Sequence, residues 1–373
     1  MSEQLDNSPA IKVGVDDGHD GIKLWFGSAN AISEPVKVQI KSNAQKGNGG
    51  IVDVSERELN QMTVIVEGQN GEEDEVFLVN ANHVTNRIDT RTPDYPYNNL
   101  NLALIMQAIR EQRSVLDGFN RLQIVAGLPA NQYYTKLTSS KNDELIDKKV
   151  NNLKSINRAY SPADAQLEDG GRFYASDVAV MPEGYGIAFN LMFDDDLNKT
   201  EYYEDFYDHG CVIVDIGGRT VDVIKVSRRT CKPKGSDLMS FDQGILYMRE
   251  AVATAVTERL NRQKTIDDFS VDNILKSGWF GKVGSKGGVD LNDMLDKIKD
   301  DHVEVIYQSI KSALESDEAM GGVIISGGGA VLLGDKLKAK IEDHDDNCEV
   351  IIPDEVVFGN AKGFWKLAWA KFQ

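Results

Sequence analysis

VGVDDG, residues 13–18, decides the fold of this chain, and IVDIGG, residues 213–218, nearly repeats it. In both places an apolar run ends in Asp-x-Gly. A second apolar run follows, at residues 22–26 in the first case and 221–226 in the second. An apolar run, a glycine turn and another apolar run form the pattern of a β-hairpin. Two such hairpins, about two hundred residues apart, predict two related domains that face one site.

The residue types in these hairpins suit the binding of phosphate and a divalent metal ion. Glycine turns let backbone N–H groups reach phosphate oxygens without a Cβ in the way. A carboxylate at a strand end repels bare phosphate but can hold the waters of a hydrated Mg²⁺ ion. We therefore expect Asp16 and Asp215 to flank one Mg²⁺ ion, mainly through water, and Lys23 to offer positive charge to the β- or γ-phosphate. One such hairpin alone would be read as an ordinary turn.

A third glycine run strengthens this interpretation. Residues 324–330 read IISGGGA, which predicts a buried strand, three glycines and the start of a helix. Gly327, Gly328 and Gly329 would let a nucleoside lie against the backbone, and the helix N-terminus favours negative charge. An isolated triple glycine is more often a simple turn before a helix than a ligand site. All three elements in this order predict a nucleotide cleft between two domains.

Length and composition set the class of protein. The chain has 373 residues, of which 41% are hydrophobic and 27% charged, which suits two globular domains. Its net charge of -18 argues against a broad basic surface, so we expect no direct binding to DNA. Residues 1–9 lack a signal pattern and no apolar run approaches the roughly 20 residues that span a bilayer, so we expect a cytoplasmic protein without a membrane partner. Three widely spaced cysteines, Cys211, Cys231 and Cys348, fit thiols in a reducing compartment.

The three motifs resemble the phosphate-1, phosphate-2 and adenosine motifs of the actin, Hsp70 and sugar-kinase superfamily. A finer likeness, to the bacterial plasmid-segregation actins of the ParM/StbA family, runs in order along nearly the whole chain. It rests on VDDG at 15–18 with IKL at 22–24, YN at 97–98 with LN at 100–101, GLP at 127–129 with YY at 133–134, VMPE at 180–183, VDIGGRTVD at 214–222 and GNAKG at 359–363.

The resemblance implies a role for each matching residue. The first phosphate loop would comprise Asp16, Asp17, Gly18, Gly21 and Lys23, and the second would comprise Asp215, Gly217, Gly218, Arg219 and Thr220. The adenine and ribose would be bordered by Gly327, Gly328 and Gly329, and the ribose would be approached by Asp242 and Gly244. Glu183 matches the carboxylate that orients or activates the attacking water. Without the resemblance, Glu183 would be equally well explained as an acid at a helix N-terminus, where the helix dipole favours it.

Some positions depart from the family pattern or are hard to align with it. His19 and Asp20 stand where small or hydroxyl residues are common in the superfamily, and we expect Asp20 to face solvent. Arg219 stands where the family often has a small polar residue. Either Lys148 or Lys149 lies near a family lysine that is linked to the nucleotide cleft.

The fold that the resemblance implies is α/β, with two RNase H-like (actin-like) domains around an interdomain nucleotide cleft, each with a smaller subdomain. The first domain would comprise residues 1–209 and 355–373, with an inserted subdomain at about 36–96, and the second would comprise residues 210–354. The segment 194–209 is acidic and rich in tyrosine, which predicts an exposed loop near the boundary.

The function implied by the resemblance is that of an actin-like ATPase, which would use ATP, with GTP as an alternative, together with Mg²⁺. It would polymerise with further copies of itself and segregate plasmid DNA through a DNA-binding adaptor protein on a centromere-like site. ATP binding would favour assembly and hydrolysis would weaken the filament. Two alternatives stay open: a small-molecule kinase and a non-polymerising regulatory actin-like ATPase. The chain lacks the GxxxxGK[ST], HExxH and GxSxG motifs of other hydrolase classes.

Overall fold

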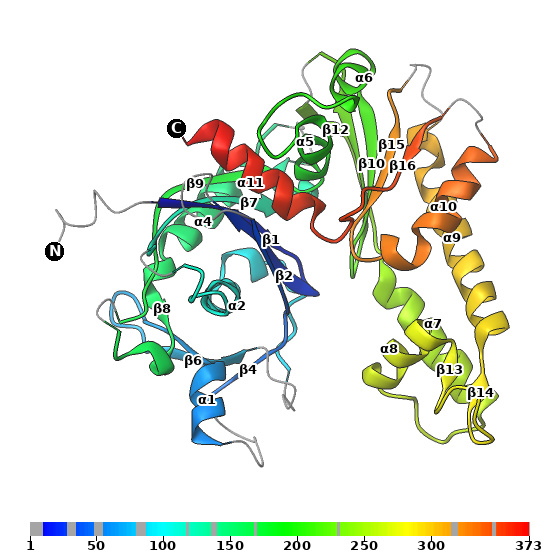
Figure 1. The fold of residues 1–373 in the computed structure, drawn as a ribbon, viewed down its shortest axis with the longest axis horizontal. Helices are drawn as coiled ribbons and strands as arrows, with labels where there is room; N and C mark the ends of the chain where they lie inside the picture. Colours follow the sequence, from blue (N-terminus) through cyan, green and yellow to red (C-terminus); the bar gives the residue numbers. More distant parts are fainter. Residues whose placement is uncertain are drawn as a thin grey trace.

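Two five-stranded sheets organise the chain (Figure 1). The computed structural model describes residues 10–27, 35–47, 55–79, 87–116, 119–135, 140–167, 170–229, 232–314, 320–344 and 348–372. The prediction of an α/β fold with two related hairpins is confirmed, since each sheet contains one of them.

The first sheet has the strand order β3-β2-β1-β7-β9. Its strands are β1 (Ala10–Asp17), β2 (Gly21–Gly27), β3 (Val36–Lys41), β7 (Arg121–Leu128) and β9 (Tyr174–Pro182). On one side of β1 the hairpin partner β2 runs antiparallel, and on the other side β7 runs parallel. Asp16 therefore lies at the end of the central strand, directly opposite Lys23 in the hairpin register.

The second sheet repeats this plan with the order β12-β11-β10-β15-β16. Its strands are β10 (Cys211–Ile216), β11 (Val221–Ser227), β12 (Lys232–Phe241), β15 (Val323–Ser326) and β16 (Val350–Ile351). The central strand β10 again has an antiparallel hairpin partner, β11, on one side and a parallel strand, β15, on the other. Asp215 thus occupies in this sheet the place that Asp16 occupies in the first.

Helices cover both sheets, which explains why their central strands read as nearly continuous apolar runs. The first sheet is covered by α2 (Asn99–Arg110), α4 (Asp143–Lys154), α5 (Tyr185–Met192) and the C-terminal helix α11 (Gly359–Lys371). The second sheet packs with α6 (Tyr202–His209), α7 (Ile245–Arg259), α9 (Asn292–Leu314) and α10 (Ala330–Glu342). The C-terminal helix lies across β1 and β7 and against α5, so the chain returns to its first sheet (Figure 1).

Helix α2 lies between the first sheet and a smaller sheet. Residues 100–109 of α2 are all buried, because β2 packs on one side of the helix and β5 and β6 pack on another. The smaller sheet has the order β4-β6-β5-β8, with β4 (Ala44–Lys46), β5 (Thr63–Val66), β6 (Glu75–Val79) and β8 (Ala159–Tyr160), and α1 (Glu56–Met62) beside it. The inserted subdomain predicted at 36–96 therefore begins on a strand of the main sheet, β3, and its sheet recruits β8 from outside that range.

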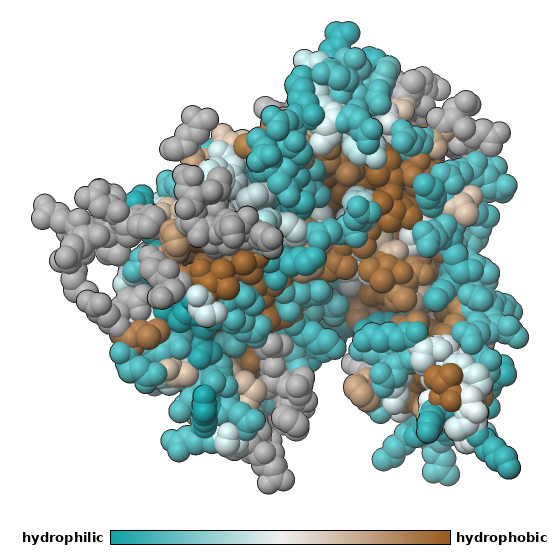
Figure 2. Space-filling model, in the orientation of Figure 1, coloured by the Kyte–Doolittle hydropathy of each residue, from teal (hydrophilic) through white to brown (hydrophobic). Residues whose placement is uncertain are grey.

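A second small unit lies beside α7. It comprises α8 (Asp268–Ser277) and the short hairpin β13 (Trp279–Phe280) and β14 (Val289–Asp290). Figure 2 shows a hollow between this unit and the smaller sheet, and it shows hydrophilic residues over the outer ends of both units. Hydrophobic residues gather in the middle of the same face, where β15, β16 and the start of α10 lie.

The prediction of an exposed loop at 194–209 was wrong for its second half, which forms α6. Phe206 is fully buried against the second sheet, and Tyr202 stacks on it with ring centroids 5.8 Å apart. The acidic residues of the helix lie on its exposed face. The aromatic spacing of four residues is the helical signal here, and it outweighs the acidic composition.

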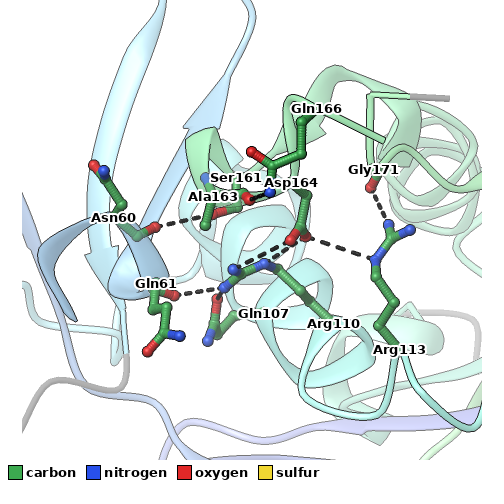
Figure 3. A network of polar contacts seen from close by, with 10 residues as sticks. All are labelled: Asn60, Gln61, Gln107, Arg110, Arg113, Ser161, Ala163, Asp164, Gln166 and Gly171. Carbon is green, nitrogen blue, oxygen red and sulfur yellow. Dashed lines mark hydrogen bonds and ion pairs between the residues drawn. The ribbon is translucent and has the colours of Figure 1, made fainter. Parts of the chain in front are cut away.

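A polar network ties the smaller sheet to α2 (Figure 3). Arg110 Nε donates to Asp164 Oδ2 at 2.6 Å, and Arg110 Nη1 donates to the carbonyl of Gln61 at the end of α1. Ser161 Oγ donates to the carbonyl of Asn60 at 3.0 Å. Only about a tenth of the Arg110 and Asp164 side chains is exposed, 10% and 13%, so the pair is shielded from solvent screening.

We expect Arg110→Ala to lower the free energy of unfolding by about 2 kcal/mol, because it leaves a mostly buried carboxylate without its main partner. Denaturant unfolding measures this change. Lys148→Ala is the matched control, since it removes an exposed pair with Glu144 and is expected to leave stability essentially unchanged. Equal stability of the Arg110 variant and wild type would contradict the structural role of this network.

Candidate functional site

The glycine turns of the two hairpins face each other. A Cβ on Gly218 would come within 3.0 Å of the Asp20 Cβ, and Arg219 Nη1 donates to the carbonyl of Arg91 at 3.0 Å. Beside these contacts lies a cavity of about 520 Å³. It is lined from the first half by residues that include Asp17, Gly18, His19 and Glu183, and from the second half by Arg219, Thr220, Asp222, Ser240 and Asp242. The cavity is therefore a cleft between the two sheets.

Carboxyl groups from both halves lie close together beside this cleft. Glu183 and Asp222 line the cavity, whereas Asp16, Lys23 and Asp215 are not among its lining residues. Lys23 Nζ lies 3.1 Å from Asp16 Oδ2. Burial lowers the pKa of Lys23, but the negative charges of Asp16 and then Asp215 outweigh it and leave that pKa raised. The hairpin register and the opposed second sheet therefore place Lys23 within the field of carboxylates from both domains.

Two further carboxyl groups in this region have raised pKa values. Burial, followed by the charge of Asp16, raises the pKa of Asp215 to about 7. Burial, followed by the charges of Asp16 and Asp222, raises the pKa of Glu183 well above its ordinary value. Negative charge thus exceeds positive charge beside the cleft, and a bound cation would relieve it.

Glu183 reaches the cleft because Gly127 makes room for it. A Cβ on Gly127, near the end of β7, would lie 2.9 Å from the Glu183 Cγ. The next residue, Gly184, has φ +82° and begins the turn into α5, and a Cβ there would lie 2.0 Å from Ile224 Cδ1 of the second sheet. Both positions therefore require glycine, one for the Glu183 side chain and one for the approach of the two halves.

Asp17 has a different environment from Asp16. Its Oδ2 accepts from Lys149 Nζ and from Asn101 Nδ2, and Lys149 is fully buried. Lys149 Nζ also donates to Asn101 Oδ1 at 3.1 Å. Of the two candidate lysines, Lys149 is thus the one that contacts the cleft, through Asp17. Lys148 lies on the surface, where it pairs with Glu144. Sequence reasoning missed Asn101 and left Lys149 undecided; the spacing of Lys149 and buried Leu153 on one face of α4 is the available signal.

The glycines of the third run allow the end of one strand to lie close to the end of another. A Cβ on Gly327 would lie 2.3 Å from Asp215 Oδ1, and one on Gly329 would lie 2.3 Å from Ile216 Cγ2. Gly328 has no such neighbour within 4 Å and faces open space. The run therefore lets the end of β15 lie directly against the end of β10. None of the three glycines lines the cavity of about 520 Å³.

The remaining predicted residues surround the second turn or support the first. Gly244 N–H donates to the Arg219 carbonyl at 2.7 Å, and Arg219 Nε donates to Asp242 Oδ1 at 3.1 Å. Gly217 N–H donates to the Thr220 carbonyl at 2.9 Å. In the first hairpin, a Cβ on Gly21 would lie 2.8 Å from the Ile40 carbonyl oxygen, so Gly21 allows β3 to approach β2. Asp20 is exposed, as expected.

Asp222 is a cleft carboxylate that sequence reasoning did not assign. It lines the cavity, and burial raises its pKa. Thr220 Oγ1 donates to Asp222 Oδ2 at 2.8 Å. The signal was present, because Asp222 is the single acidic residue of β11, which reads VDVIKVS, and it follows the second glycine turn closely.

The site fits a hydrated Mg²⁺ ion better than a metal ion held by protein ligands alone. In the part of the chain that the structure describes, no group of three or more His, Cys, Asp or Glu side chains forms a metal site of its own. Mg²⁺ keeps most of its waters and is usually held by one or two carboxylates together with substrate phosphates. Asp16 and Asp215, with their excess of negative charge, match that requirement.

Solved structures of actin-like proteins match this fold over nearly the whole chain. The actin-like protein Alp7A has a TM-score of 0.73 and 15% identity, with 97% of each chain covered. ParM from a 15-stranded filament of Clostridium botulinum has a TM-score of 0.67 and 16% identity, with 97% of this chain and 99% of that chain covered. The archaeal actin homologue Ta0583 in complex with ADP has a TM-score of 0.65 and 17% identity, with 97% and 100% covered. These matches show that the chain has the fold of actin-like proteins.

Two family models match the sequence itself. "Plasmid segregation protein ParM, N-terminal" matches residues 11–193, and "Archaeal actin homologue MreB-like, C-terminal" matches residues 213–339. No curated protein matches the chain. The first part of the chain therefore matches the ParM/StbA family and the second part matches another actin homologue, which supports the resemblance drawn from the motifs. Within the described ranges, no helix has the length and apolar character needed to cross a bilayer.

We expect the nucleotide-free, Mg²⁺-free protein to lose stability as pH rises from about 4 to about 7, in part because of Asp215. The folded state keeps a proton on Asp215 up to a pKa of about 7, whereas the unfolded chain releases it near ~3.9. The folded state therefore binds more protons in this window, and the free energy of unfolding falls as pH rises, by at most about 1.4 kcal/mol per pH unit for this group.

Unfolding curves at several pH values, for wild type and for Asp215→Asn, measure this contribution. The variant is expected to have a shallower dependence of stability on pH between about 4 and about 7. Identical slopes for the two proteins would show that the Asp215 carboxyl is not held in its neutral form by the fold.

Proposed function

We propose that this protein is an ATPase that polymerises with further copies of itself in the presence of Mg-ATP and drives plasmid DNA segregation. The observation that carries the proposal is the pair of Asp-Gly hairpins, one from each half, that face each other across a cleft containing Glu183. The match to the ParM family model supports it, as does the ADP complex of an archaeal homologue with the same fold. GTP would fit the same phosphate contacts.

The residues of the first half would bind the phosphates from one side and those of the second half from the other. Backbone N–H groups of Gly18 and Gly218 would contact phosphate oxygens, together with Lys23 and Thr220. The Gly217 N–H already donates to the Thr220 carbonyl, so Gly217 would shape the second loop. Asp16 and Asp215 would hold the waters of Mg²⁺, which supplies positive charge between the β- and γ-phosphates when bound. The adenine and ribose would be bordered by Gly327, Gly328 and Gly329, with Asp242, Gly244 and Arg219 near the second turn.

Glu183 would orient the water that attacks the γ-phosphate. Phosphoryl transfer needs a positioned water and electrostatic stabilisation rather than covalent chemistry from the protein. Burial raises the pKa of Glu183, so its carboxylate would take up a proton more readily than an exposed one, as a general base requires. Asp17 accepts hydrogen bonds from Lys149 and Asn101, so it would hold the first loop in place.

Filament assembly would follow from closure of the cleft. Apart from the chain connections, the halves touch through contacts such as Arg219 to Arg91 and Lys41 to Asp272, the latter 3.7 Å apart. A nucleotide bound by both hairpins adds contacts to the closed form alone and shifts the population toward it.

We infer that one domain comprises residues 1–209 and 355–373 and that the other comprises residues 210–354. We also infer that the protein is cytoplasmic.

The filament would be connected to plasmid DNA by an adaptor protein. The net charge of -18 argues against a broad basic surface for the DNA backbone. A basic, DNA-binding protein on a centromere-like site would supply the missing charge and contact the acidic filament.

Right-angle light scattering of the purified protein, with phosphate release followed in the same sample, tests this function. Mg-ATP is expected to raise the scattering, which then decays as phosphate appears. Phosphate release without a rise in scattering across a broad protein concentration range would favour a non-polymerising regulatory ATPase. Absence of both signals would contradict the proposal.

Glu183→Gln separates binding from hydrolysis in the same experiment. We expect a rise in scattering like that of wild type, a slower decay, and phosphate release reduced about a hundredfold, because the amide cannot take up a proton from the water. Unchanged phosphate release would remove Glu183 from the proposed mechanism.

A further inference from the structure

The side chain of Asn360 connects the two halves of the cleft. Its Oδ1 accepts a hydrogen bond from the Gly184 N–H at 2.8 Å, and its Nδ2 donates to Asp215 Oδ2 at 3.0 Å. Gly184 directly follows Glu183, whereas Asp215 belongs to the other sheet. One buried amide, 5% exposed, therefore bonds both to the turn that carries Glu183 and to the carboxylate opposite it.

The orientation of this amide is determined by its partners. The backbone N–H of Gly184 only donates, so it must face the amide oxygen Oδ1, and this leaves Nδ2 to donate to Asp215 Oδ2. An aspartate at position 360 would keep an acceptor for Gly184 but would place a second carboxylate against Asp215. An alanine would remove both bonds. Comparing these two substitutions therefore separates the bond to Gly184 from the bond to Asp215.

The backbone that carries Asn360 is fixed by close contacts. A Cβ on Gly363, one turn further along α11, would lie 1.7 Å from the Gly186 carbonyl oxygen of α5. A Cβ on Gly14, within β1, would lie 1.9 Å from the Ala361 carbonyl oxygen. The start of α11 thus touches the backbone of the helix that follows Glu183 and of the strand that ends in Asp16. A side chain on such a packed backbone has little freedom to shift.

We propose that Asn360 is a positioning residue for hydrolysis, which holds the Glu183 turn at a fixed distance from Asp215 across the cleft. This inference rests on the proposed ATPase function. Asn360 does not line the cavity of about 520 Å³, so it acts through Glu183 and Asp215 rather than on the nucleotide. Because Asn360 lies on α11, a change in the separation of the two halves would act on the C-terminal helix through these two bonds.

Steady-state phosphate release over a range of ATP concentrations tests this role through a double-mutant cycle. Asn360→Ala is expected to lower kcat about tenfold or more, with KM within about threefold of wild type. Adding Asn360→Ala to Glu183→Gln is expected to cost less than about twofold beyond Glu183→Gln alone, because the two residues act as a unit. Multiplied losses in the double variant, or a wild-type kcat for Asn360→Ala, would overturn the inference.

Two further variants separate positioning from general damage to α11. Asn360→Asp conserves size and is expected to lower kcat as Asn360→Ala does, which keeps the test decisive if the alanine variant is poorly folded. Lys362→Gln removes the pair with Asp195, 2.9 Å apart, on the same helix and is expected to retain wild-type kcat and KM. A similar loss of kcat in Lys362→Gln would refute a specific role for Asn360.

Hydrogen exchange tests the contact without relying on turnover. In Asn360→Ala, exchange of the Gly184 amide is expected to rise about fivefold or more, while the Val212 amide, which donates to the Gly322 carbonyl, stays as in wild type. A wild-type protein that releases no phosphate would refute the proposed function alone. Unchanged exchange at Gly184 in the variant would refute the role of Asn360 in either case.

Discussion

A cluster of crowded carboxyl groups at the meeting point of the two sheets is the constraint on which this structure depends. Asp16 and Asp215 lie near the ends of the two central strands, and the charges of Asp16 and Asp222 act on Glu183. Lys23 is paired with Asp16, and Lys149 is paired with Asp17. Buried charge without a partner is costly, so the cleft favours a bound cation and the phosphates that such a cation bridges.

The fold supports this charge with rigid elements rather than loops. Each Asp stands near the end of a strand that has neighbours on both sides. Gly14 and Gly363 let α11 lie directly against the backbone of β1 and α5, and Gly327 lets the end of β15 lie against the end of β10. The C-terminal helix completes the arrangement, because it packs on the first sheet while Asn360 bonds to Asp215 of the second. A cleft built in this way can change its opening with little change inside either half.

Local patterns in the sequence predicted the two hairpins and their internal repeat, because strand periodicity and glycine turns are short-range signals. The partners of the cleft residues could not be predicted in that way. Asn101 and Lys149 meet Asp17 from 84 and 132 residues away, and Asn360 meets Asp215 from 145 residues away. Such contacts arise only when the chain returns to a sheet. Helix α6 was missed because acidic composition was given more weight than aromatic spacing, and the predicted roles of the glycines at 327–329 stay untested.

The dependence of nucleotide binding on Mg²⁺ tests the central claim most directly, namely that the carboxylates of both hairpins form one Mg-nucleotide site. Isothermal titration calorimetry of wild type with ATP, in the presence of Mg²⁺ and then of a chelator, is the measurement. ATP is expected to bind in the presence of Mg²⁺ and to bind at least about tenfold more weakly without it, because the triphosphate alone would face unneutralised carboxylates. Equal affinity under the two conditions would place the nucleotide, if bound at all, away from Asp16 and Asp215.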